Sequence, residues 1–129
     1  MLDSLFRPRG VAVIGASNNT FSIGNRVVKN LVTHNFKGGI YPVHPKESEI
    51  LGLKAYASIL DVPGPVDIAC IVVKNTMVPQ VVEDCGKMGV KFVIIHTAGF
   101  SEMGPDGAKL QEELLDAARR YGVRVYGPS

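Results

Sequence analysis

Small polar residues follow an apolar run in the stretch VAVIGASNNTFSIGN, residues 11–25. The run ends at Gly15 and Gly24 opens a pattern of helical spacing, so a strand would turn sharply into a helix here. Such a turn exposes backbone N–H groups, and the helix N-terminus adds a partial positive charge. The stretch predicts a site for phosphate or pyrophosphate, with Ser17 and Asn18 as further donors. A plain connection between two elements is the alternative, because Ser17 and Thr20 replace glycines of the dinucleotide fingerprint G-x-G-x-x-G.

A second group of candidate residues lies in YPVHPK, residues 41–46. A conventional NAD site places an acid at the end of the second strand, whereas this chain has His44 and Lys46 there. A lysine suits a phosphorylated ribose, as in NADP or in coenzyme A. An exposed surface lysine is the alternative, although Pro42 and Pro45 would stiffen the backbone that presents Lys46.

The stretch HTAGFSEMG, residues 96–104, combines small residues, a carboxylate and an aromatic side chain that we expect to be exposed. It could line a narrow channel for a thin chain such as pantetheine, which favours coenzyme A over NADP. A hydride-transfer enzyme would also need a substrate domain, for which 129 residues leave little room.

Apolar runs alternate with helical patterns, and this order predicts the elements that would position these groups. Expected strands are residues 10–15, 38–43, 67–73, 91–97 and 123–127. Helices are expected after the N-cap candidates Ser22 and Thr76 and over residues 108–121, with Gly122 as a stop. One helical turn is also expected in HPKESEI, residues 44–50. Their apolar stripes would be Ile23, Val27, Val28, Leu31 and Val32; Val78, Val81, Val82 and Cys85; and Leu110, Leu114, Leu115 and Ala118.

The alternation predicts an α/β fold: a Rossmann-like, doubly wound parallel sheet of about five strands in three α/β/α layers, formed by one domain over residues 1–129. Ligands of such sheets bind beyond the carboxyl ends of the strands. Four loops, residues 15–18, 43–46, 73–75 and 96–102, would therefore form the site. Val43, Val73 and Lys74 join the candidate binding residues on this ground.

Composition excludes several classes of function. A net charge of +2 is too small for a nucleic-acid-binding surface, although the first 54 residues carry seven basic and three acidic side chains, which favours a local anionic ligand. No apolar run approaches a membrane span, and the N-terminus does not resemble a secretory signal, so we expect a cytoplasmic protein. Cys70 and Cys85 fall in apolar patterns and are expected to be buried free thiols.

No catalytic or metal-ligating residue is predicted. His96 ends an expected strand, but no carboxylate in the sequence is placed to orient it, so a backbone-bonded histidine is the preferred interpretation. Glu102 could orient a thiol or contact a partner domain, and a solvated loop carboxylate is at least as good an interpretation. His34 is expected to place a favourable charge at a helix end.

Seven segments together resemble a known family. VAVIGAS, GN-x-V-x-x-NL, IYPVHPK-x-x-EI-x-GLKAY, PVDIACIVV, VVEDCGKMGVK, TAGFSE and YGVRVYGPS occur in this order. They resemble the CoA-binding domain of NDP-forming acyl-CoA synthetases, which include the ADP-forming acetyl-CoA synthetases and, more distantly, the succinyl-CoA synthetase alpha subunit. The resemblance implies coenzyme A as ligand, with the pyrophosphate at the glycine turn, a phosphate on Lys46 and the thiol end near residues 97–100. The resulting candidate binding residues are Gly15, Ala16, Ser17, Asn18, Gly24, Val43, His44, Pro45, Lys46, Val73, Lys74, Thr97, Ala98, Gly99 and Phe100.

The resemblance also implies partners. The chain would be the N-terminal part of a larger ligase, whose other domains or subunit carry the phosphohistidine and the ATP-grasp fold, and it would not be catalytically complete alone. A stand-alone CoA-binding regulatory module is the alternative, and an NADP-binding Rossmann domain is a weaker one. Two positions depart from the family: His44 stands where asparagine is common, and the chain ends in GPS where GPN is common.

Overall fold

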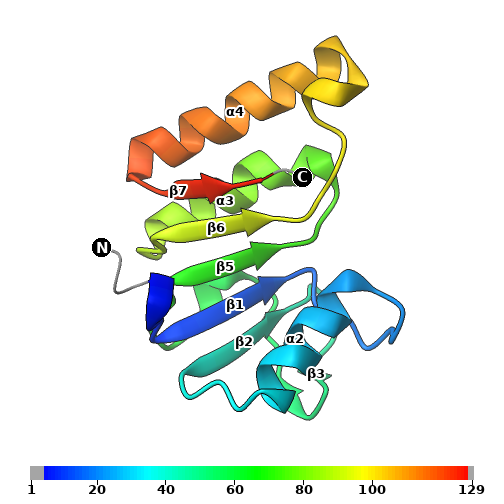
Figure 1. Cartoon of the computed structure of the whole chain (residues 1–129), viewed down its shortest axis with the longest axis vertical. Helices are drawn as coiled ribbons and strands as arrows, with labels where there is room; N and C mark the ends of the chain where they lie inside the picture. Colours follow the sequence, from blue (N-terminus) through cyan, green and yellow to red (C-terminus); the bar gives the residue numbers. More distant parts are fainter. Residues whose placement is uncertain (1–4, 128–129) are drawn as a thin grey trace.

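The computed structural model describes residues 5–127, which form one five-stranded parallel sheet with helices on both faces (Figure 1). The strands are β1 (Gly10–Ile14), β2 (Gly39–Val43), β5 (Ile68–Ile71), β6 (Phe92–Ile95) and β7 (Arg124–Tyr126), in the order β2-β1-β5-β6-β7. The helices are α2 (Ile23–Thr33), α3 (Val78–Lys87) and α4 (Pro105–Tyr121). Two short strands, β3 (Glu49–Ile50) and β4 (Leu53–Lys54), form a hairpin, and 3-10 turns cover η1 (Ile59–Asp61), η2 (Asn75–Met77) and η3 (Ser101–Met103).

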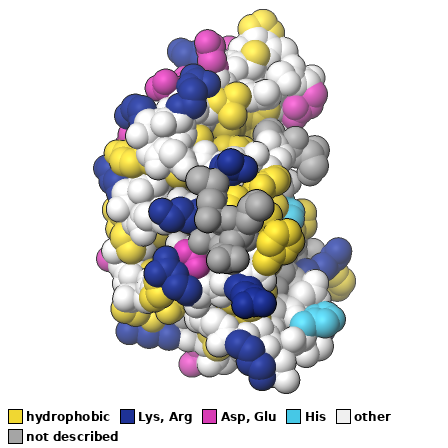
Figure 2. Space-filling view, turned by 60° about the vertical axis from the view of Figure 1, so that its left-hand side comes forward, with side chains coloured by type: hydrophobic (Ala, Val, Ile, Leu, Met, Phe, Trp, Pro, Cys, Tyr) yellow, Lys and Arg dark blue, Asp and Glu magenta, His cyan; other side chains and the backbone are white. Residues whose placement is uncertain are grey.

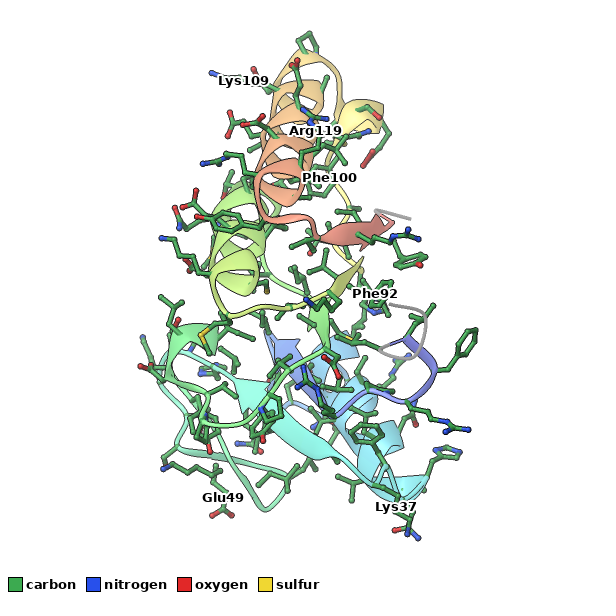
Figure 3. All side chains as sticks on the ribbon, turned by 90° about the vertical axis from the view of Figure 1, so that its left-hand side faces the viewer. Lys37, Glu49, Phe92, Phe100, Lys109 and Arg119 are labelled. Atoms are coloured by element: carbon green, nitrogen blue, oxygen red, sulfur yellow. The ribbon has the colours of Figure 1, made fainter. Side chains whose placement is uncertain are left out.

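The predicted three-layer α/β/α fold is confirmed. Helix α2 packs on β1 and β2 from one side, and α3 packs on β5 and on α4 from the other (Figures 1 and 3). The segments of β1 and β5 read GVAVI and IACI, and every residue in them is buried. Central strands covered on both faces need such continuous apolar runs, because neither face meets water. Among residues 5–127, no helix is both long enough and apolar enough to cross a membrane.

The expected helical turn in HPKESEI is wrong. Residues 44–48 form a loop and Glu49–Ile50 forms β3, which pairs with Leu53–Lys54. The hairpin turns through Leu51 and Gly52, whose φ angles are 50° and 78°. Two consecutive residues with positive φ are typical of a tight hairpin turn, and glycine at the second position lowers its cost. Gly52, two residues after the apolar Ile50, was the sequence feature that could have predicted this hairpin turn.

The helix termini follow the sequence in part. The Ser22 side chain caps α2 and accepts from the N–H of Asn25 at 3.1 Å, and Gly122 ends α4 in the left-handed conformation, as predicted. Thr76 is not a cap, because η2 precedes α3 and the N-cap is Met77, which makes no side-chain bond. Helix α4 begins at Pro105 rather than at residue 108. Proline is favourable in the first turn of a helix, because the N–H groups of that turn make no hydrogen bond within the helix.

The expected apolar stripes contain three errors. Ile23, Val32 and Leu115 are 47%, 46% and 36% exposed. Val28 is fully buried against the sheet, and Val27 and Leu31 are partly buried beside it. Helix α2 therefore buries a narrower apolar stripe than the sequence suggests. Short helices that cover a sheet from one side need only such a stripe.

Cys70 and Cys85 are buried free thiols, as predicted. Burial raises the pKa of Cys70 to about 11. Burial, together with the negative charge of Asp84, raises the pKa of Cys85 to about 12. Both side chains therefore act as small apolar groups of the core.

An ion pair fastens the amino ends of β1 and β5. Asp67, with its side chain 1% exposed, accepts from Arg9 through Nε at 3.1 Å, through the terminal nitrogen at 2.8 Å and through the backbone N–H at 2.8 Å. Hydrogen bonding to Arg9 lowers the pKa of Asp67 below its ordinary 3.8. The positive charge of Lys91 also lowers the pKa of Asp67. Figure 2 shows one face of the molecule on which several Lys and Arg side chains are exposed.

Candidate functional site

The carboxyl ends of the strands open onto one pocket of about 440 Å³. It lies where β1 has β2 on one side and β5 on the other, so that connections leave the sheet in opposite directions. Open α/β sheets bind ligands at such a switch point. The lining residues are Ile14, Gly15, Val43, Pro45, Ala57, Ser58, Ile59, Val73, Thr76, Met77, Gln80, Val81 and Asp84. The predicted residues Gly15, Val43, Pro45 and Val73 are therefore brought together.

Backbone packing explains both glycines of the turn after β1. Gly15 has φ 96° and its N–H donates to Val43 O at 3.1 Å. A Cβ on Gly15 would collide with the carbonyl of Val72, and a Cβ on Gly24 would collide with the carbonyl of Gly15. Gly24 is buried, so its contribution is to let the start of α2 approach the turn. The N-terminus of α2 thus lies directly against the Gly15 turn, as an anion site of this type requires.

Asn25 holds the turn and was missed by the sequence analysis. Its side chain is 2% exposed and donates to the carbonyl of Ser17 at 2.9 Å. The Ser17 hydroxyl in turn accepts from the N–H of Asn19 at 2.9 Å. A polar residue on the inward face of an otherwise apolar helical stripe was the available signal, since buried polar groups are nearly always hydrogen-bonded.

Asn18 connects the turn to the β3–β4 hairpin. Its amide nitrogen donates to Glu49 O at 3.0 Å, and its amide oxygen accepts from the N–H of Leu51 at 3.3 Å. Both ends of the side chain are thereby engaged. Any contact of Asn18 with a ligand would come from its backbone rather than from the side-chain donor that the sequence suggested.

His44 shapes the turn that presents Lys46. The ring Nδ1 accepts from the N–H groups of Lys46 and Glu47, each at 3.0 Å. With Nδ1 as acceptor, the neutral ring carries its proton on Nε2, so the histidine offers a donor on its other side. Lys46 is exposed and makes no ion pair with any of residues 5–127. Its ammonium group therefore remains available beside the pocket wall formed by Pro45.

The loops after β5 and β6 are fastened to each other. Thr97 Oγ1 donates to Val73 O at 2.6 Å, and Asn75 Nδ2 donates to Gly99 O at 2.7 Å. Lys74 is exposed at the start of η2. Thr97, Ala98 and Gly99 lie outside the 440 Å³ pocket, so the candidate site consists of that pocket and a separate loop beyond β6.

The expectation of an exposed aromatic in this loop is wrong. Phe100 is completely buried and belongs to the core cluster on the α3–α4 face, beside α4 (Figure 3). Gly107 of α4 lies so close that a Cβ there would collide with the Phe100 carbonyl. A large apolar side chain between small residues fills the core here, and only the Phe100 backbone can reach a ligand.

Glu102 fixes the same loop from the solvent side. Its carboxylate accepts from the N–H of Gly99 at 2.6 Å and of Phe100 at 2.8 Å. These hydrogen bonds, with that of Phe100 as the largest cause, lower the pKa of Glu102. The carboxylate thus stays ionised and holds the loop. His96 is half-buried, and its backbone N–H donates to Ile71 O at 3.0 Å, while its ring has no hydrogen bond to any of residues 5–127.

Four pocket residues at the end of η2 and along α3 were not among the candidates. Met77, Gln80, Val81 and Asp84 all line the pocket. Their spacing, i, i+3, i+4 and i+7, places them on one helical face, which was the available signal. Val81 was expected in the core stripe of its helix, and the polar residues Gln80 and Asp84 beside it were not expected to border a ligand.

Comparison with known proteins identifies the family of the chain. A family model described as "CoA binding domain" matches residues 9–129. The chain is 48% identical over its whole length to the alpha subunit of ADP-forming acetate–CoA ligase II from Pyrococcus furiosus, and 45% identical to the ADP-forming 4-hydroxybutyrate–CoA ligase of Nitrosopumilus maritimus. It covers 28% and 18% of those proteins.

Solved structures agree. An acetyl-coenzyme A synthetase from Ca. Korarchaeum cryptofilum, in complex with phosphate and ADP, superposes with a TM-score of 0.92 at 45% identity over 99% of this chain and 27% of that one. A conserved hypothetical protein from Pyrococcus furiosus superposes with a TM-score of 0.73 at 30% identity, over 94% of both chains. The order of the seven motifs, the sheet topology and these matches all point the same way, and the chain belongs to the family of CoA-binding domains.

Proposed function

We propose that this chain binds coenzyme A at the carboxyl edge of its sheet and serves as the CoA-binding part of an ADP-forming acyl-CoA ligase. One observation carries the proposal. The pocket at the switch point is bordered by the Gly15 turn on one side and by Pro45, the neighbour of Lys46, on the other. Two features that suit phosphate groups therefore flank one ligand-sized cavity.

The two phosphate-bearing ends of the nucleotide fit these two features. The pyrophosphate would accept from backbone N–H groups of the turn at Gly15, Ala16 and Ser17, where the dipole of α2 favours negative charge. The 3′-phosphate would pair with the exposed ammonium of Lys46, and the Nε2–H of His44 is a second donor near it. An ordinary NAD site would need an acid in place of Lys46.

The pantetheine arm would lead toward the loop beyond β6. Thr97, Ala98 and Gly99 are small or polar. The Thr97 hydroxyl donates to the carbonyl of Val73, and the Gly99 backbone is held by Asn75 and Glu102. A loop already fixed in one conformation loses little entropy when a ligand binds, which supports a role in presenting the thiol.

The acyl transfer would need more protein than this chain. The chain spans between 18% and 28% of the relatives described above, so we propose that residues 1–129 are the N-terminal CoA-binding domain and that other ligase domains or a second subunit carry the phosphohistidine and the ATP-grasp fold. The acid that is activated is left open, since the relatives include acetate, 4-hydroxybutyrate and feruloyl enzymes. Free buried thiols at Cys70 and Cys85 favour a cytoplasmic location.

A stand-alone CoA-binding module is the second candidate. The Pyrococcus furiosus protein of matching length supports it, because the match covers 94% of that solved chain and leaves little of it for a further domain. Purification of the native protein, followed by an assay for ATP formation from acyl-CoA, ADP and inorganic phosphate with release of CoA and the acid, separates the two. Activity in the purified material supports the ligase, and CoA binding without activity supports the module.

A thermal-shift comparison of CoA, NADP and ATP tests the proposed ligand. A ligand that binds only the folded protein raises its stability by mass action. At a concentration of about 100 times the dissociation constant, CoA should add about 2.7 kcal/mol to the stability, and NADP should add little. Stabilisation by NADP in the absence of any CoA effect would reject the proposal.

A further inference from the structure

The pocket at the switch point has mainly aliphatic walls. Ile14, Val43, Ile59 and Val73 line it from the sheet and from η1, and Val81 does so from α3. Such walls suit an uncharged, flat group that leaves water. The polar side chains that border the pocket are few, namely Ser58, Thr76, Gln80 and Asp84.

Asp84 is the one carboxylate among these lining residues, and it is held in place by Gln80. The Gln80 amide nitrogen donates to Asp84 Oδ1 at 3.1 Å and to Glu83 Oε2 at 3.2 Å. Among residues 5–127, no hydrogen bond reaches Asp84 Oδ2. Asp84 is half-buried, so an oriented acceptor with a vacant oxygen borders an apolar cavity. An ionised carboxylate can only accept, so it selects a ligand that donates.

The same carboxylate excludes phosphate from the pocket, because two negative charges at close range repel. Phosphate-binding features lie instead at the rim, at Gly15 and next to Pro45. In coenzyme A the two phosphorylated positions belong to the ribose that carries the adenine. A nucleotide with its phosphates at both rim features would therefore direct its base into the cavity.

Resting on the proposed function, we propose that the pocket takes the purine base of coenzyme A and that Asp84, positioned by Gln80, accepts a hydrogen bond from the 6-amino group. Asp84 is then a specificity-determining residue: it favours a 6-amino purine and disfavours a 6-oxo purine, whose oxygen would face the carboxylate. A site built around one such hydrogen bond rejects an analogue that leaves the buried group unpaired.

The test compares CoA with its analogue that carries hypoxanthine in place of adenine, by calorimetric titration of the full chain. The unmodified protein should bind CoA about tenfold or more tightly than the analogue. Asp84→Asn keeps the shape, and its amide can rotate to donate to the 6-oxo group, so the preference should fall to about threefold or less. Asp84→Ser shortens the side chain and should also lower the preference. Asp116→Asn, the same change on the exposed face of α4, should retain it.

Other results have distinct meanings. An unchanged preference in folded Asp84→Asn and Asp84→Ser, with CoA still bound, overturns this inference and leaves the proposed function intact. The Asp84 variants should also be titrated with the two halves of CoA. If they bind 4′-phosphopantetheine more weakly but 3′-phosphoadenosine 5′-phosphate as before, the inference is overturned, because the thiol arm would then occupy the cavity. Failure of every form to bind CoA rejects the proposed function itself. Thermal unfolding of each variant verifies that it is folded.

Discussion

The imidazole of His44 holds the backbone of Lys46, whose N–H donates to the ring Nδ1 at 3.0 Å. At this position the family resemblance implies asparagine, and the histidine found here shapes the turn that presents Lys46, the lysine proposed to bind phosphate. Asparagine can accept from an N–H two residues further on in the same way. A histidine at this position is therefore a structural substitute for asparagine, and its Nε2–H remains as a further donor.

This relationship predicts different effects for two substitutions of His44. His44→Asn should change CoA affinity by less than about threefold, because the acceptor of the turn is kept. His44→Ala removes the acceptor of two N–H groups and should weaken CoA by about fivefold to tenfold. Calorimetric titration measures both. Equal affinities for the alanine and the unmodified protein would show that the ring does not position Lys46.

Gly24→Ala should disturb both stability and binding. The added Cβ would collide with the backbone carbonyl of Gly15, which cannot rotate away as a side chain could. Overpacking of this kind costs about 1–3 kcal/mol. Urea unfolding should show the loss, and Asn30→Ala, on the exposed face of the same helix, should be neutral or slightly stabilising. A Gly24→Ala protein as stable as the parent would contradict the close packing of α2 on the turn.

The Arg9–Asp67 pair predicts a loss of stability in acid. The pKa of Asp67 is lowered in the folded protein, so folding favours the ionised carboxylate. Its contribution is complete well above pH 3.8, the ordinary pKa, and is lost as the pH falls through the lower folded value. Unfolding free energies of the parent should fall over this range, and Asp67→Asn should show a shallower fall. Identical slopes for the two proteins would remove Asp67 from this role.

Glu102 should matter for the thiol arm and not for the nucleotide. Glu102→Ala releases the N–H groups of Gly99 and Phe100, so the loop beyond β6 should lose its fixed conformation. We expect CoA to bind about threefold to tenfold more weakly, while 3′-phosphoadenosine 5′-phosphate binds as before. Glu113→Ala on α4 is the control. A parallel loss for both ligands would mean that Glu102 acts on the whole domain.

The sheet could be predicted because its strands are continuous apolar runs, and glycines punctuate several of them. Runs such as VAVI and IACI are stable only when both faces of the strand are covered. Their alternation with helical patterns was therefore enough to predict a parallel sheet. Gly15 could be placed beside the pocket for a similar reason, since it follows β1 directly. The phosphate-binding role of Lys46, three residues beyond β2, stays a prediction. The hairpin at β3–β4 was missed because its strands are only two residues long and carry no periodic pattern.

Contacts between distant segments could not be predicted. Phe100 looked exposed because its neighbours in sequence are small and polar, yet its environment is made by α4, which follows it in the chain. Asn18 looked like a ligand donor because nothing local uses its amide, and its partners at Glu49 and Leu51 lie about thirty residues away. Asp84 borders the pocket because α3 packs where Ile14, Val43 and Ile59, which are distant in sequence, also line the pocket.

In the proposed function, the Gly15 turn and Lys46 together bind the phosphorylated nucleotide of CoA. This joint role is tested most directly by calorimetric titration of the unmodified chain and of Lys46→Ala, each with CoA and with 3′-dephospho-CoA. Lys46→Ala should weaken CoA by about threefold to tenfold, since the lost charge pair is exposed, and should leave 3′-dephospho-CoA nearly unchanged. Lys37→Ala, near the amino end of β2 and thus away from the carboxyl ends of the strands, should affect neither ligand. Equal losses for both ligands, or no loss for CoA, would contradict the account.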